Sequence, residues 1–60
     1  MESKTEPVVV SVNDQLPPVG DRVIVVCKDC RCLGYLDRHG LWRDDAQHRE
    51  LQDVIGWVEV

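Results

Sequence analysis

A six-residue run in the middle of the chain, Arg22–Cys27 (RVIVVC), limits the fold more than any other stretch. The run is too short for a stable helix, is rich in β-branched side chains, and follows a segment with two prolines and a glycine. A short continuous apolar run of this kind is typical of a strand that is covered on both faces. We therefore expect Arg22–Cys27 to be the central strand of a small sheet.

Four other segments carry strand signals, because β-branched or aromatic residues are frequent in them or alternate with polar ones. One of them follows the central run after only Lys28-Asp29, which predicts an antiparallel hairpin partner. In the last of them, regular alternation predicts that Val54 and Trp57 point to opposite faces of the sheet. The four segments are Val8–Val12, Cys30–Leu36, Leu41–Arg43 and Val54–Val60.

The connections between these segments show little helix character. Residues 13–20 contain two prolines and predict an ordered loop, and Asp37–Gly40 has glycine at the position that a type I turn favours. Residues 44–53 contain good helix formers, but only Ala46 and Leu51 are apolar, so no stripe could dock a helix. We expect at most one helical turn there.

The chain has 60 residues, which is enough for one domain. We expect residues 1–7 to be a disordered tail and residues 8–60 to form a single, mainly β domain. Four to five short strands predict a small curled antiparallel sheet or an SH3-like barrel, since closure removes free strand edges.

The charge balance excludes some partners. The net charge is −4, whereas binding to a phosphate backbone needs a basic surface. Direct binding of nucleic acid is therefore not expected, and a basic protein would be the better partner. The first ten residues, MESKTEPVVV, contain no apolar run that fits a signal peptide or a membrane span, so we expect a cytoplasmic protein without membrane association.

Three cysteines, Cys27, Cys30 and Cys32, lie within six residues. An odd number of thiols in a reducing compartment is not a disulfide framework. A two-residue hairpin loop would place all three thiols on one face, where they could be small core residues, zinc ligands or redox groups. Zinc would need His39 or His48 as the fourth ligand, and each of these stands isolated in the sequence.

Aromatic and acidic residues supply the other candidate binding groups. Trp42, Trp57 and Tyr35 are the only aromatic residues, so they must form either the core or a contact surface. We expect the two tryptophans in the core, because each contributes a large apolar area, whereas the Tyr35 hydroxyl suits an exposed contact. Asp44 and Asp45 belong to an acidic C-terminal third of the chain that could face a basic partner.

Four segments together form a distinctive pattern: Val10–Val26 (VSVNDQLPPVGDRVIVV), Gly34–Asp37 (GYLD), Gly40–Trp42 (GLW) and Val54–Trp57 (VIGW). They resemble a family of small phage- and prophage-encoded domains of unknown function with the pattern W-x-S-V-x-D-x-L-P-x-x-G-x-x-V-x-V, G-Y-x-D, G-x-W and V-x-x-W. Gly56 stands where the family often has histidine. The resemblance implies a small, mostly β domain in a bacterial host or phage-infected cell, and it assigns no activity.

No motif for phosphate binding, paired carboxylates or nucleophilic catalysis is present in the sequence, so we expect no enzyme. The leading expectation is a non-enzymatic interaction or accessory module of phage or prophage type that binds a protein and needs no cofactor. One alternative is a zinc-stabilised domain built on the cysteine hairpin, and another is an acidic mimic or inhibitor of a basic host protein. A homodimer also fits, since Val54–Val60 could pair within the chain or with a second subunit.

Overall fold

The computed structural model describes residues 8–60, so the predicted disordered tail, residues 1–7, lies outside the described part. This part contains five strands and no helix, as the sequence predicts for a mainly β domain. The strands are β1 (Val10–Ser11), β2 (Val23–Cys27), β3 (Arg31–Leu36), β4 (Trp42–Asp44) and β5 (Val54–Glu59).

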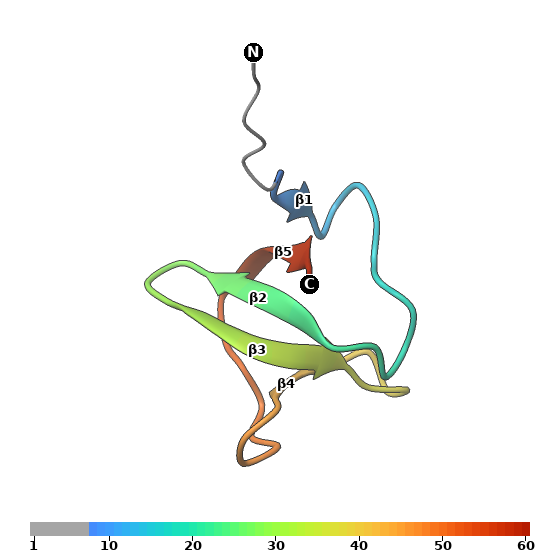
Figure 1. The fold of residues 1–60 in the computed structure, drawn as a ribbon, viewed down its shortest axis with the longest axis vertical. Coiled ribbons are helices and arrows are strands. Elements are labelled where there is room, and N and C mark those ends of the chain that lie inside the picture. The colour runs from blue at the N-terminus through green and yellow to red at the C-terminus, as the bar shows by residue number, and fades with distance from the viewer. Residues whose placement is uncertain (1–7) are drawn as a thin grey trace.

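The five strands form one antiparallel sheet with the order β1-β5-β2-β3-β4 (Figure 1). The last strand of the chain, β5, lies between the first strand and the central one. It therefore pairs within its own chain. The sheet has two edges, β1 and β4, so of the two predicted architectures the structure shows the small curled sheet.

Strand β2 is the central strand and is covered on both faces, as its apolar run predicts. Val23, Val25 and Cys27 are buried on one face, and Val26 is buried on the other. Four neighbouring pairs in the β2–β3 ladder keep one register, from Val23–Gly34 to Val26–Arg31. The amide of Cys27 donates to the carbonyl of Cys30 at 2.7 Å, which closes the predicted hairpin around Lys28-Asp29.

The turn between β3 and β4 also matches the prediction. The amide of Gly40 donates to the carbonyl of Asp37 at 3.0 Å, and Gly40 has a φ of +83°. Residues other than glycine rarely adopt this φ, so the backbone conformation of the turn requires glycine at position 40.

Residues 45–53 form a turn and a short extended segment instead of a helix. The amide of His48 donates to the carbonyl of Asp44, which makes one isolated turn. The chain then runs back along β4, where Arg43 and Glu50 form an isolated bridge. The amide of Leu51 donates to the carbonyl of Trp42 at 2.7 Å, so this segment covers the outer edge of β4.

The prediction that Val54 and Trp57 face opposite sides of the sheet is wrong. Val26 pairs with Gly56, but the next residue of β2, Cys27, pairs with Val54, so Ile55 is an extra residue in a β-bulge. The bulge returns Val54 to the face that carries Trp57. Trp57 is buried in the core and Val54 packs against it, while Ile55 is 54 % exposed.

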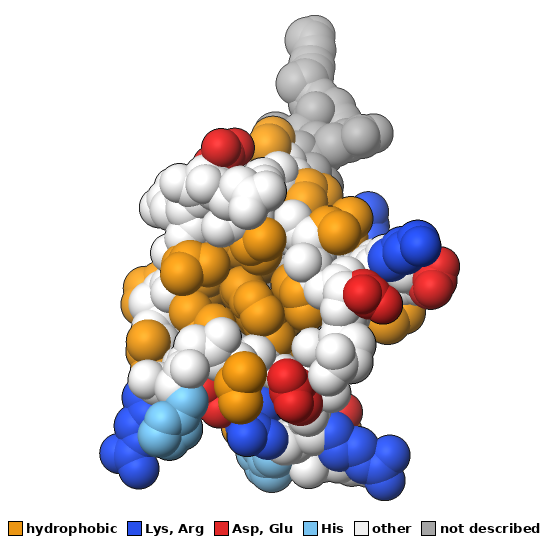
Figure 2. All heavy atoms as spheres, turned by 180° about the vertical axis from the view of Figure 1, so that it is seen from behind, with side chains coloured by type: hydrophobic (Ala, Val, Ile, Leu, Met, Phe, Trp, Pro, Cys, Tyr) orange, Lys and Arg blue, Asp and Glu red, His pale blue; other side chains and the backbone are white. Residues whose placement is uncertain are grey.

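The core lies on the inner face of the curled sheet. It consists of Val23, Val25, Cys27 and Trp57, and side chains from the other elements pack against it while remaining partly exposed; these are Val10, Val12, Trp42, Leu51 and Val54. Apolar side chains consequently reach the surface, and Figure 2 shows them in the middle of one face with charged side chains around them.

Candidate functional site

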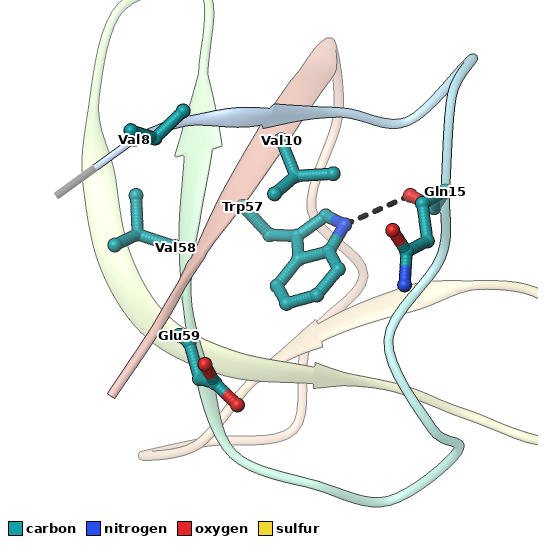
Figure 3. Close-up of a pocket in the computed structure, with 6 residues that line it drawn as sticks. All are labelled: Val8, Val10, Gln15, Trp57, Val58 and Glu59. Carbon is teal, nitrogen blue, oxygen red and sulfur yellow. Dashed lines mark hydrogen bonds between the residues drawn. The ribbon is translucent and has the colours of Figure 1, made fainter.

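A hollow lies where β1 and β5 diverge (Figure 3). Its volume is about 480 Å³, and its lining combines residues from the two ends of the described chain with one loop residue. The lining residues are Val8, Val10, Gln15, Trp57, Val58 and Glu59. Glu59 is the one charged side chain among them.

Trp57 is the floor of this hollow and also part of the core. It is only 7 % exposed, and it lies opposite Val25 on one side and Val10 on the other. Its indole nitrogen Nε1 donates to the backbone carbonyl of Gln15 at 2.9 Å (Figure 3). This bond holds the loop between β1 and β2 against the hollow, because a buried indole N–H needs an acceptor.

Within the described part of the chain, the edge of β5 beside the hollow is only partly paired. Strand β1 pairs with β5 only at Val10–Trp57 and Ser11–Gly56. Val58 and Glu59 pair with β2 on their other side, at Ile24 and Val23. Within residues 8–60, no strand pairs with Val58 or Glu59 on the β1 side. An open strand edge of this kind can accept an added strand.

Tyr35, predicted as an exposed contact residue, lies outside the hollow in a polar cluster on the opposite end of the sheet. Its hydroxyl is 2.8 Å from Nδ1 of His48, and the two rings meet edge to face. Arg43 lies opposite Tyr35 on β4 and donates to the carbonyl of His48. The hydroxyl thus already has a partner within the chain.

Asp37 stabilises the turn between β3 and β4, near Tyr35. It accepts bonds from the amides of Leu41 and His39 and from Nε of Arg43 at 2.8 Å. The amide of Leu41, followed by the Arg43 guanidinium, lowers the pKa of Asp37 to about 2. Asp37 is therefore an ionised turn residue that holds β3 and β4 together.

The predicted acidic residues also make bonds within the chain. Asp44 accepts from the amide of Gln47 at 2.7 Å, which lowers the pKa of its carboxyl group. Asp45 forms an ion pair with Arg22 at 3.2 Å. Trp42 is half-buried and packs against the core, so of the predicted binding residues Trp57 alone lines the hollow.

The three cysteines gather at the hairpin but differ in exposure. Cys27 is buried, Cys32 is half-buried and Cys30 is exposed. Burial, assisted by Cys30, raises the pKa of Cys27 to about 11, and burial also raises the pKa of Cys32. These two thiols are protonated at neutral pH, which disfavours either of them as the first thiol to attack a reagent in solution.

The histidines considered as zinc ligands lie elsewhere. His39 is in the turn between β3 and β4, and His48 bonds to Tyr35. Within residues 8–60, no three His, Cys, Asp or Glu side chains form a group that could hold a metal ion. The zinc-stabilised alternative stays a prediction, and the structure adds no fourth ligand to it.

The sequence does not indicate most of the residues that line the hollow. Val8, Val10, Gln15, Val58 and Glu59 come together only because β1 pairs with β5, and no local pattern marks that long-range pairing. The nearest signal is the pair of valine-rich segments at the two ends of the described chain.

Comparisons with family models, curated proteins and solved structures found no match to this chain. Residues 8–60 contain no helix that is long and apolar enough to cross a bilayer.

Proposed function

We propose that this protein is a non-enzymatic interaction module of the phage or prophage accessory type, which binds a partner protein at the hollow between β1 and β5. The observation that carries the proposal is that, among residues 8–60, a hollow lined by four apolar and two polar residues lies beside a stretch of β5 that pairs with no strand on the β1 side. An edge supplies backbone hydrogen bonds, and an adjacent apolar pocket selects side chains. The partner contributes an extended segment.

The charges of the site indicate the composition of that segment. Glu59 lines the hollow, and Asp14 adjoins the lining residue Gln15 in the sequence. The net charge of the whole chain is −4. Complementary potentials favour the encounter of such a surface with a basic partner. We therefore infer a partner segment that alternates apolar and basic residues, met in the cytoplasm of a bacterial or phage-infected cell.

The phage or prophage assignment depends on the resemblance carried by the block SVNDQLPPVG. In the structure this block begins at Ser11, the second residue of β1, and continues into the loop whose Gln15 carbonyl accepts the hydrogen bond from Trp57. The most specific part of the family pattern therefore borders the hollow. This location supports a shared binding surface in preference to a shared catalytic group.

The experiment begins with capture from a bacterial lysate on the immobilised full chain, followed by identification of the partner and calorimetry with both purified proteins. Val8→Lys places a positive charge at a lining residue that is 79 % exposed, so folding should be unaffected. We expect it to weaken binding at least tenfold, which is about 1.4 kcal/mol, because it removes an apolar contact and repels a basic segment. The matched control is Val19→Lys, at a loop valine that is 58 % exposed and does not line the hollow.

Equal affinity of Val8→Lys and the unchanged protein would place the partner elsewhere and contradict the proposal. Failure to recover any specific protein at micromolar concentration would also count against it. Amide protection of Glu59 and Val60 in the complex, measured by hydrogen exchange, would support addition of a strand at this edge.

A further inference from the structure

The hairpin tip carries a second feature that the interaction surface does not use. Cys27 ends β2 and Cys30 immediately precedes β3. The register of the β2–β3 ladder, continued by one pair, places them opposite each other, and the amide of Cys27 donates to the carbonyl of Cys30 at 2.7 Å. Both thiols are free.

Strand geometry distinguishes this pair from the other two. Hydrogen-bonded residues that face each other across antiparallel strands have Cα atoms about 5.5 Å apart, close to the preferred Cα distance for a disulfide, about 5.5–6 Å. Cys30 and Cys32 are two residues apart along the chain at the start of β3, where the extended rise of about 3.4 Å per residue puts their Cα atoms near the upper limit for a bridge. Cys32 lies opposite Val25, so it has no facing thiol.

The surroundings of the pair suit an anionic reagent. A surface hollow of about 370 Å³ lies at the tip, lined by both thiols together with Val26, Lys28, Asp29, Arg31 and Ile55. Two cations and one carboxylate among these residues leave a positive balance in the hollow itself, while the carboxylate of Asp53 acts on Cys27 from outside this lining. Cys30 is exposed and Cys27 is buried, so only one thiol of the pair is open to attack a reagent in solution.

We propose that Cys27 and Cys30 form a reversible intramolecular disulfide by exchange with a small anionic disulfide such as glutathione disulfide. The Cys30 thiolate attacks one sulfur of the reagent, forms a mixed disulfide and releases one glutathione thiolate. The Cys27 thiol then loses its proton and attacks Sγ of Cys30, which forms the Cys27–Cys30 bond and releases the second glutathione. Two protein thiols are oxidised and one glutathione disulfide is reduced to two glutathione molecules. Because burial keeps Cys27 protonated, its attack should be slow, and a transient mixed disulfide at Cys30 should precede the Cys27–Cys30 bond and then disappear.

The test treats the full chain with glutathione disulfide, blocks the remaining thiols with iodoacetamide, and maps labels and bonds by mass spectrometry. We expect a Cys27–Cys30 bond, a label on Cys32, and complete reversal by reduced glutathione. Cys32→Ser should react in the same way, whereas Cys27→Ser should stop at a glutathione adduct on Cys30. The native and urea-unfolded chains should differ in which cysteines they pair. In the native chain, most of the disulfide should join Cys27 to Cys30.

Three results would overturn the inference. They are a native chain that retains stable adducts on Cys30, one that bonds Cys32 preferentially, and one that pairs its cysteines in the same proportions as the unfolded chain. The wild-type mapping decides among these without any variant, so poor folding of Cys27→Ser would not obscure the answer.

Discussion

At the scale of single residues, a few side chains have a structural role that their type alone does not reveal. Trp57 belongs to the core, forms the floor of the hollow and fixes the β1–β2 loop through the Gln15 carbonyl. Asp37 appears in the sequence as an ordinary turn residue, but its carboxylate joins the turn to β4 through Arg43. Both residues can be tested by substitutions that preserve shape.

Trp57→Phe should lower the free energy of unfolding by about 1 kcal/mol for the lost hydrogen bond, with a further loss from the smaller ring. The larger change Trp57→Ala should cost about 3–5 kcal/mol, because it leaves a cavity in the core. Urea unfolding of the wild type, Trp57→Phe and Trp57→Ala measures both losses of stability. If Phe and Trp gave equal stability, the bond to Gln15 would contribute nothing.

Asp37→Asn should change the dependence of stability on pH. The pKa of Asp37 is about 2 in the folded chain, below the value of about 3.9 expected when unfolded. Its contribution is fully present above pH ~3.9 and is lost as the pH falls through about 2. The stability difference between wild type and Asp37→Asn should therefore shrink across this interval. Thermal unfolding at several pH values measures it, and a difference independent of pH would contradict the assignment.

At the scale of elements, the β1–β5 contact depends on the absence of a side chain. A Cβ atom at Gly56 would lie 2.6 Å from Cγ1 of Val9 and 2.7 Å from the carbonyl oxygen of Val10. The histidine frequent at this position in the family that the sequence resembles could not be placed here without moving β1. The close approach of β1 therefore requires glycine.

Gly56→Ala should displace β1 and destabilise the protein by about 1–3 kcal/mol, the usual cost of overpacking. The double variant Val9→Ala with Gly56→Ala removes the side-chain clash and leaves the backbone clash. We expect partial recovery, measured by urea unfolding. Full recovery would show that the Val10 carbonyl does not limit the space, and full stability of Gly56→Ala would show that β1 is not tightly held.

The sequence predicts the elements that depend on local signals. The β-branched run of β2, the two-residue connection to β3 and the glycine of the β3–β4 turn each act within a few residues, and all three appear in the structure. The bulge at Ile55 could not be foreseen, because alternation has the same appearance with or without an extra residue. It reverses the face of Val54, which packs in the core.

At the scale of the whole molecule, the candidate site was the least predictable part. Trp57 was predicted as a binding residue, but the residues around it come from β1, the following loop and the end of β5. Their meeting is a property of the strand order, which places the last strand beside the first. The sequence predicts Tyr35 as a contact residue from its hydroxyl group, and Asp44 and Asp45 from their charge, and the structure shows all three bonded within the chain.

Binding through an acidic surface should respond to salt. Raising the ionic strength from about 0.1 M to 1 M shortens the Debye length from about 10 Å to about 3 Å, so binding of a basic segment should weaken. Glu59→Gln should reduce that salt dependence, because it removes the charge that lines the hollow. Calorimetry at both salt concentrations measures the effect, and binding that does not change with salt would exclude a basic partner.

Metal analysis tests the zinc-stabilised alternative. Since the structure shows no group of three ligands in residues 8–60, we expect protein purified without added metal to contain far less than one zinc per chain. Addition of a chelator should leave the melting temperature unchanged. A chelator would lower the melting temperature only if it removed a zinc ion that stabilises the fold. One zinc per chain, together with melting lowered by the chelator, would establish the alternative.

The pairing of β1 with β5 also makes folding and recognition inseparable. Val10 and Trp57 are partners at a sequence separation of 57 − 10 = 47 residues, whereas the β2–β3 hairpin closes around two residues. Loop-closure entropy delays long-range contacts, so the hairpin should form early and β1 should dock late. The hollow exists only after that docking. A ligand of the hollow would consequently bind the completed native state alone and shift the folding equilibrium by mass action.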